Sequence, residues 1–257
     1  MISSSGWKLM KLEGKVAIVT GGGRRIGRAI ATAFAQEGAK VTVVAARQEA
    51  EIEEVASRIG GTALAADVSK PADVQRLVET VISRFGEIDI LVNNAARGMR
   101  FINEDFMTTP KPFWETDPDA WRMVIDTNVS GVFLLTRAVV PHMLWRGWGR
   151  IINISINRET MERKGFTPYG PSKAALESMS MIWAQELAGT GITLNMLLPG
   201  GATNTGMIPE SLPESKRREL IDPVVMGPPA VYLASDEAGD INGQRIVAKE
   251  WMKNRSN

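Results

Sequence analysis

Two side chains in the second half of the chain, Tyr169 and Lys173, have the types and the spacing that acid–base chemistry needs. Residues 151–154 before them have the composition of a buried strand, and helical spacing follows from Ala174 onward. If that helix begins near Pro168, the two side chains lie on one face, one turn apart. An ammonium there favours the phenolate and lowers the pKa of the tyrosine from about 10, which lets the hydroxyl exchange a proton near neutral pH. The alternative is two unrelated surface side chains, because Tyr and Lys often fall at this spacing by chance.

Four further motifs stand in a fixed order around this pair. Three follow strand-like runs and one lies in a helical run: the glycine-rich turn Thr20–Gly27, Asn93-Asn-Ala-Ala96, Pro199-Gly200 and, in the helix, Asn128. With the Tyr169–Lys173 pair they resemble the classical type of the short-chain dehydrogenase/reductase (SDR) family, over residues 11–247. The resemblance implies an oxidoreductase that transfers a hydride between a nicotinamide cofactor and a carbonyl or secondary alcohol substrate.

The hydrophobic pattern indicates the fold independently. Apolar runs alternate with segments of helical spacing: strands at 15–20, 41–45, 62–66, 88–92, 151–154 and 192–198, and helices at 26–36, 49–59, 71–85, 119–144 and 172–187. This alternation predicts an α/β fold, a single-domain Rossmann-type doubly wound parallel sheet with helices on both faces. No repeat or domain boundary interrupts it. We therefore expect residues 1–10 to be an N-terminal extension and residues 11–257 to be one dinucleotide-binding and catalytic domain.

Composition and charge exclude several other classes of protein. Thirty Lys and Arg against 29 Asp and Glu give a formal charge of +1, so nothing indicates nucleic acid or an anionic membrane as a partner. The chain has no cysteine and one histidine, His142, which leaves no cluster of metal ligands, and we predict no metal site. It has no run of about 18 uncharged apolar residues and no apolar N-terminal segment, which predicts a cytoplasmic protein.

The turn after the first strand is the expected cofactor site. Backbone amides and the positive end of the following helix meet a pyrophosphate there, and glycines permit close approach. The family pattern is Thr-Gly-x-x-x-Gly-x-Gly, and this chain keeps Gly21 and Gly27 but has Arg25 at the middle glycine. Some pteridine reductase-like members carry an arginine there, which indicates a modified site. A glycine-rich turn without a ligand is the alternative.

Charge near the end of the second strand selects the cofactor. NAD sites place an acid about 20 residues beyond the turn, whereas an arginine accommodates the 2′-phosphate of NADP. This chain has Ala46 and then Arg47 at that position, and Arg24 lies in the turn. Two guanidinium groups without a carboxylate suit a phosphate dianion, so we predict NADP(H) over NAD(H). The alternative for either arginine is a solvated surface charge.

The resemblance assigns the remaining cofactor contacts. It implies Asp67 and Val68 at the adenine edge, Asn93 at the adenosine ribose, and Pro199-Gly200 at the nicotinamide. The full predicted set lies on the first turn, at the strand ends and on the catalytic helix: Gly21, Gly23, Arg24, Arg25, Ile26, Gly27, Arg47, Asp67, Val68, Asn93, Ala95, Tyr169, Lys173, Pro199, Gly200 and Thr203.

The catalytic roles also come from the resemblance. It implies that Tyr169 exchanges the proton, that Lys173 tunes the tyrosine and binds the nicotinamide ribose, and that Asn128 holds a relay water. In the family, a serine that binds the substrate oxygen stands thirteen residues before the tyrosine. That position is Ile156 here, and Ser155 precedes it. Either the loop carries an extra residue and Ser155 serves, or the serine is absent; we predict Ser155.

Three segments depart from the family pattern. The loop 97–118 is long and rich in aromatic residues and arginines, which predicts a wall for a large, partly planar or anionic substrate; a surface loop over the sheet end is the alternative. The segment 202–223 has the place of the family's mobile lid, and the C-terminus lacks the usual Val-Asp-Gly-Gly. The competing function is a catalytically weak, cofactor-binding regulator. By resemblance, the helices at 119–144 and 172–187 imply a homodimer or homotetramer.

Overall fold

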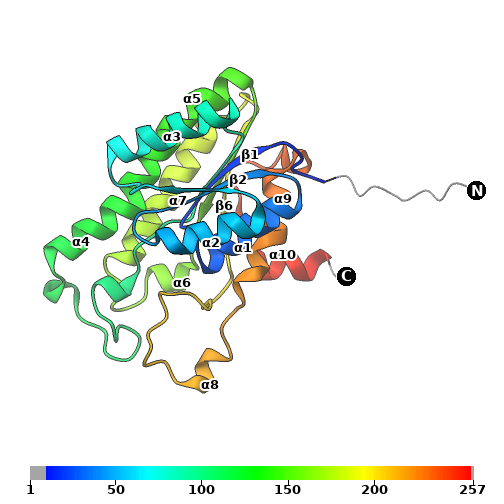
Figure 1. The fold of residues 1–257 in the computed structure, drawn as a ribbon. Helices are drawn as coiled ribbons and strands as arrows, with labels where there is room; N and C mark the ends of the chain where they lie inside the picture. Colours follow the sequence, from blue (N-terminus) through cyan, green and yellow to red (C-terminus); the bar gives the residue numbers. More distant parts are fainter. Residues whose placement is uncertain (1–9, 256–257) are drawn as a thin grey trace, which may run out of the picture.

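The structure is a computed structural model that describes residues 10–255, so the predicted N-terminal extension lies outside the described residues, apart from Met10. Within that range, seven parallel strands form one sheet in the order β3-β2-β1-β4-β5-β6-β7, with helices on both faces (Figure 1). This is the predicted doubly wound, Rossmann-type sheet. The strands are β1 (Val16–Thr20), β2 (Lys40–Ala45), β3 (Thr62–Ala65), β4 (Ile90–Asn93), β5 (Gly149–Ile154), β6 (Ile192–Leu198) and β7 (Arg245–Val247).

The helices cover the sheet in two layers. One layer contains α1 (Arg25–Gln36), α2 (Glu49–Ile59) and α9 (Gly227–Ala234), and the other contains α3 (Pro71–Phe85), α5 (Gly131–Arg146) and α7 (Tyr169–Glu186). The predicted helix at 119–144 divides into α4 (Pro118–Ile125), a π-helical segment (Asp126–Ser130) and α5. The pattern did not predict β7, α9 or the short helices α6 (Arg158–Met161), α8 (Glu214–Arg217) and α10 (Ala248–Arg255). Most of these elements are too short to show a period.

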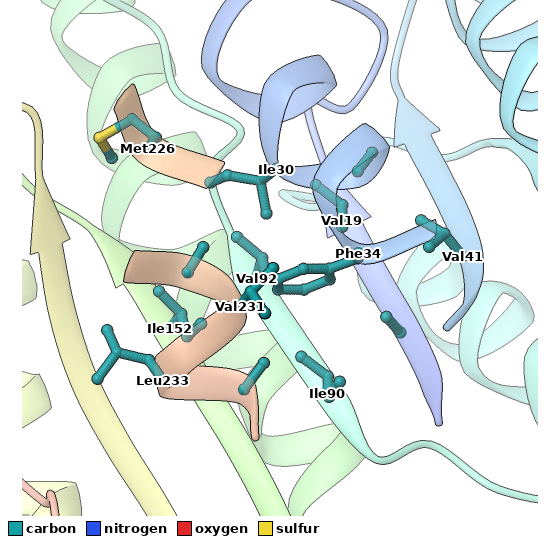
Figure 2. Packing of buried hydrophobic residues seen from close by; sticks show 14 of the residues in the cluster. Val19, Ile30, Phe34, Val41, Ile90, Val92, Ile152, Met226, Val231 and Leu233 are labelled. Carbon is teal, nitrogen blue, oxygen red and sulfur yellow. The ribbon is translucent and has the colours of Figure 1, made fainter. Parts of the chain in front are cut away.

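Two hydrophobic cores lie on opposite faces of the sheet. Ala17 and Val19 of β1 pack into the first core, whereas Val16 and Ile18 pack into the second. Successive residues of a strand point to opposite faces, and both faces are buried because the sheet is parallel. Figure 2 shows the first core, where Phe34 of α1 lies among strand residues and α9. Because both faces of the sheet are covered, we expect the functional side chains at the edge where the strands end.

The longest helical run extends over Pro118–Arg146. By length and composition it is apolar enough to cross a membrane, but 44% of its apolar window is buried inside the protein. Leu135, Val139 and Met143 of this run belong to the second core. The run is therefore a core helix of the sheet fold.

Candidate active site

A cavity of about 410 Å³ opens at the carboxyl ends of the strands. It is lined by the turn after β1, by the ends of β2 to β6 and by the loops that follow β4, β5 and β6. Most of the residues predicted from the sequence lie around this one space: Gly21, Gly23, Arg24, Arg25, Ile26, Gly27, Arg47, Asp67, Val68, Ala95, Ser155, Tyr169, Lys173, Pro199 and Thr203.

Three predicted residues do not line the cavity among the described residues: Asn93, Asn128 and Gly200. The prediction for the Asn93 side chain is wrong, since it is buried and donates to Thr136 Oγ1 (3.1 Å) and Asn153 Oδ1 (2.8 Å). The next residue, Asn94, lines the cavity instead and donates to the backbone oxygens of Thr20 and Gly21. Consecutive residues at a strand end point to opposite sides, so only one of the two asparagines reaches the cavity.

Asn128 is buried in the π-helical segment and holds the start of the loop after β4. Its Oδ1 accepts from the backbone amide of Arg97 (2.8 Å), and its Nδ2 donates to the Arg97 carbonyl (3.0 Å) and to Ser172 Oγ (3.0 Å). These bonds use both amide hydrogens and the oxygen of the side chain. The side chain therefore positions Arg97 and α7, and its relay water stays a prediction.

The turn between β1 and α1 has the geometry that an anionic group needs. The first turn of α1 has no side-chain cap and no acidic residue, so its amide groups remain available to a phosphate. Arg25 adopts a φ of 50°, the left-handed conformation that a glycine takes without strain. Its Nη1 donates to Asn204 Oδ1 at 3.2 Å, which joins the turn to the segment after β6. At Gly27 a Cβ atom would lie 2.1 Å from the Gly21 carbonyl oxygen, so no larger residue fits.

The predicted phosphate-binding arginines lie at the rim beyond this turn. Arg24 and Arg47 both line the cavity, but Arg24 is also 3.7 Å from the carboxylate of Glu51 on α2. Both partners are about half exposed, so water and salt screen this pair and a bound phosphate competes with it. Asp67 accepts hydrogen bonds from the amide and hydroxyl of Ser69. Burial raises the pKa of Asp67, but these bonds, together with the charges of Arg97 and Lys70, leave the pKa below its usual value.

Tyr169 and Lys173 lie buried on the first turns of α7 and line the cavity. The Lys173 Nζ donates to the carbonyl oxygen of Ile154 at 2.7 Å and lies 6.0 Å from the centre of the Tyr169 ring. Burial lowers the pKa of Lys173 to about 8, while the charge of Glu177 opposes that shift. Burial raises the pKa of Tyr169. This direction is opposite to the predicted lowering of the tyrosine pKa, and its cause is the loss of solvent around the buried phenol.

The two residues after β5 point in different directions. Ser155 is buried, and its hydroxyl donates to Glu177 Oε1 at 2.6 Å. Ile156 packs instead against the apolar cluster that contains Tyr169. To donate to a substrate oxygen, Ser155 would first leave a charge-assisted hydrogen bond worth about 1.5–3 kcal/mol. Ser155 lines the cavity, but its hydroxyl is engaged by Glu177, and this hydrogen bond argues against the predicted role.

The outer half of the cavity is an apolar chamber next to Tyr169. Its side chains come from the loops after β4, β5 and β6, and the rings of Phe106 and Phe166 meet edge to face with centroids 5.3 Å apart. The chamber is lined by Met99, Phe106, Met107, Ile156, Phe166, Tyr169 and Met207, and Ile102 packs against them. Methionine side chains adapt their shape and contact aromatic rings favourably, so this chamber suits an apolar substrate body.

Arg100 connects the loop 97–118 to the segment after β6. Its Nη1 donates to the Gly206 carbonyl at 3.0 Å, and its other nitrogens pair with Glu104 and Glu210. A second link runs from the Ser211 hydroxyl to Asp105 at 2.8 Å. In Figure 1 both segments lie at the same end of the molecule, beside α6. The predicted substrate wall and the predicted lid thus touch each other over the chamber.

Sequence reasoning missed two side chains that shape this site, Glu177 and Arg245, and it named a third, Arg97, only as one of the arginines of the loop 97–118. Arg97 lines the cavity and donates to Thr127 Oγ1 at 2.9 Å. Glu177 and Arg245 pair with each other and form hydrogen bonds to the two residues after β5, Ser155 and Ile156. Only Glu177 had a signal in the sequence, because it stands four residues after Lys173 and so one helical turn away.

Comparison with known proteins agrees with this geometry. The family model described as short chain dehydrogenase matches residues 15–216 of the chain. The chain belongs to the classical short-chain dehydrogenase/reductase family. Among its relatives, the 3-oxoacyl-(acyl-carrier-protein) reductase FabG of Salmonella typhimurium is 35% identical over 254 residues, which covers 95% of this chain and 99% of that protein. A short-chain type dehydrogenase/reductase of Picea abies is 35% identical, with 91% of each chain covered.

Solved structures of the family have the same fold as this SDR. A 3-ketoacyl-(acyl-carrier-protein) reductase from Brucella melitensis, complexed with NADH, is 34% identical, with a TM-score of 0.81. That comparison covers 92% of this chain and 97% of the other. A putative short-chain alcohol dehydrogenase from Sinorhizobium meliloti has the same TM-score at 28% identity, with coverage of 93% and 96%. This SDR is therefore an oxidoreductase that uses a nicotinamide cofactor.

Proposed function

We propose that this SDR is an NADP(H)-dependent reductase of a ketone or related carbonyl group, acting in reverse on the secondary alcohol. The observation that carries the proposal is the position of Tyr169 and Lys173, buried between the glycine-rich turn and the apolar chamber. A cofactor in the inner half and a carbonyl compound in the outer half would meet at Tyr169. The bound cofactor supplies the hydride that reduces the carbonyl carbon.

The residues of the turn fit the cofactor. The free amide groups at the start of α1 suit its pyrophosphate, and the tight contact of Gly27 with Gly21 leaves the backbone open to it. Arg24 and Arg47 supply positive charge at the rim, and residues 45–48 contain no acid. This charge favours the 2′-phosphate and supports NADP(H) over NAD(H).

Tyr169 acts as the proton donor in the reducing direction. Because burial raises the pKa of its phenol, Tyr169 is protonated at neutral pH and can give its proton to the oxygen of the carbonyl as hydride arrives. The Lys173 ammonium is charged below its pKa of about 8, and it stabilises the phenolate that this step leaves. The Ile154 carbonyl holds the ammonium in place.

The substrate oxygen receives less help here than in a plain family member. Ile156 stands beside Tyr169 where the family carries its serine, and the hydroxyl of Ser155 donates to Glu177. Tyr169 therefore donates the hydrogen bond that polarises the carbonyl. The apolar chamber excludes water and strengthens that single bond.

The chamber also supports a substrate class. Relatives of this SDR are 3-oxoacyl-(acyl-carrier-protein) reductases, so reduction of a ketone fits the family. The methionine and phenylalanine walls favour a substrate with a bulky or ring-shaped apolar body. Oxidation of NADPH with a panel of linear and cyclic ketones tests the proposal, and no oxidation with any of them would contradict it.

The second candidate function is a cofactor-binding regulator with weak turnover. Two observations favour it: Arg25 replaces a glycine in the turn, and Ile156 replaces the serine. The same ketone panel separates the two functions, because a regulator binds NADPH without oxidising it.

Assembly into a homodimer or homotetramer is part of the proposal. Large apolar side chains stand exposed on α4, α5 and α7, the helices expected at the subunit interface: Trp121, Met123, Phe133, Leu144, Trp145, Met181 and Ile182. Such a patch favours association with a second copy. Sedimentation of the intact protein measures its oligomeric state. The cytoplasmic location also stays a prediction.

A further inference from the structure

An ion pair between Glu177 and Arg245 contacts the two residues that follow β5, Ser155 and Ile156, which we call the corner. No step of the proposed reaction involves this ion pair. The Arg245 Nε donates to Glu177 Oε1 at 2.9 Å, and both side chains are partly buried. The same Oε1 accepts the Ser155 hydroxyl at 2.6 Å. Arg245 Nη2 donates to the backbone oxygen of Ile156 at 2.8 Å. The pair therefore holds both residues of the corner, one by its side chain and the other by its backbone.

The pair joins elements from three parts of the chain. Glu177 lies on α7, Arg245 begins the edge strand β7, and the corner follows β5. The backbone amide of Ser155 also continues the ladder to Leu197 of β6, at 2.9 Å. With its amide in the ladder and its hydroxyl on Glu177, Ser155 is fixed toward α7. The side chain of Ile156 is then left to face Tyr169.

Glu177 also acts on Lys173, which lies one helical turn before it. The ionisable groups around this part of the site are Glu177 and Tyr169 on the same helix as Lys173, Arg245 on β7, and Arg97 on the cavity wall after β4. Tyr169 is neutral because burial raises its pKa. Glu177 is thus the anion that opposes the desolvation of Lys173. Arg245 Nε lies 2.9 Å from that carboxylate and pairs with it.

We propose, on the basis of the function proposed above, that Glu177 and Arg245 are positioning residues of this active site. They turn the Ser155 hydroxyl away from the substrate, and together they set how firmly the Lys173 amine holds its proton. Tyr169 consequently donates the hydrogen bond to the substrate oxygen. Glu177 and Arg245 set the charge of the Lys173 amine, which stabilises the Tyr169 phenolate.

This arrangement predicts opposite effects for the two partners. Glu177→Gln keeps the shape and the acceptor for Ser155 but removes the negative charge, so the pKa of Lys173 falls further. Arg245→Gln removes the cation that pairs with Glu177. The negative charge of the Glu177 carboxylate then stabilises the Lys173 ammonium more strongly, so the pKa of Lys173 rises. A purely structural pair gives no such opposition of sign.

The experiment is an NMR titration of the intact protein carrying ¹³C-labelled lysine, without cofactor or substrate. The Lys173 signal is identified by its loss in Lys173→Arg. It is expected to titrate near pH 8 in the unmodified protein. We expect shifts of at least about half a pH unit, downward in Glu177→Gln and upward in Arg245→Gln. Glu186→Gln, at the exposed end of the same helix, is the matched control and leaves the titration unchanged.

Shifts of the same sign, or no shift in either variant, overturn the proposal. Arg245→Lys keeps the positive charge and is expected to restore the unmodified titration. If Glu177→Gln does not fold, the contrast between Arg245→Gln and Arg245→Lys decides in the same way. The titration needs no turnover, so its outcome is independent of whether the protein reduces any ketone.

Discussion

The two halves of the cavity are built in different ways. The inner half, around the turn after β1, is made of backbone amides, glycines and the end of one helix. The outer half, around Tyr169, is made of side chains from three loops that are far apart in the sequence. The first surface is set by local rules of turns and helix ends, whereas the second depends on which loops meet. Such a difference allows one cofactor site to serve many substrates.

The largest expected effect is that of Tyr169→Phe. Loss of the phenol removes the transferred proton and the single hydrogen bond to the substrate oxygen, so kcat should fall by about 10²–10⁴-fold. The affinity for NADPH should stay nearly unchanged, because the inner half is untouched. Steady-state kinetics and NADPH fluorescence titration measure the two quantities. A variant with full activity would place the chemistry elsewhere in the cavity.

The next effect tests the corner after β5 with a matched pair. Ile156→Thr and Ile156→Val differ by one hydroxyl, so their ratio isolates a new donor beside Tyr169. A donor aimed at the substrate oxygen is worth about 10²–10³ in rate when preorganised, and we expect about tenfold here without a supporting shell. Ser155→Ala should change kcat by less than about threefold, because its hydroxyl serves Glu177. A hundredfold loss in Ser155→Ala, with equal rates for the pair, would show that the serine is the donor after all.

Cofactor preference tests the inner half. NADPH should bind at least about tenfold tighter than NADH, which is 1.4 kcal/mol, because Arg24 and Arg47 line the cavity and supply positive charge for the proposed 2′-phosphate site. Replacing Ala46 with Asp and Arg47 with Ala should reverse the order. Competition titrations with both cofactors measure it. Equal affinities in the unmodified protein would exclude the phosphate site.

The smallest effect concerns the contact between loop 97–118 and the segment after β6. Arg100→Gln removes the pairs to Glu104 and Glu210 and weakens the bond to Gly206, so the KM for a bulky ketone should rise about threefold to tenfold. NADPH affinity should not move. Arg122→Gln, which breaks an exposed pair with Asp119 outside the chamber, is the control. An unchanged KM would indicate that the loop covers the end of the sheet and does not bind the substrate.

The sequence predicted the fold well because its signals are local. The strand-like runs and the helical spacing fall within a few residues of the observed elements, and the order of strands follows from the family topology. The turn and the Tyr169–Lys173 spacing are also local features, and the structure brings them to one cavity.

The parts that failed depend on contacts between distant residues. Consecutive residues of β4 point to opposite faces, so the side chain that reaches the cavity, Asn93 or Asn94, depends on the face to which each is directed where the strand ends. The direction of Ser155 depends on Glu177 and Arg245, which follow it in the chain by 22 and 90 residues in the numbering. The pKa of Tyr169 depends on how completely the loops cover it. No short motif reports any of these three properties.

The most direct test of the account is hydride transfer itself. NADPH carrying deuterium at the reactive nicotinamide carbon is incubated with the unmodified protein and the best ketone of the panel, and the alcohol is analysed by mass spectrometry. The account predicts one deuterium on the carbinol carbon of the product, and almost no labelled alcohol with Tyr169→Phe at the same NADPH occupancy. NADPH binding with no labelled alcohol from any ketone would contradict the account.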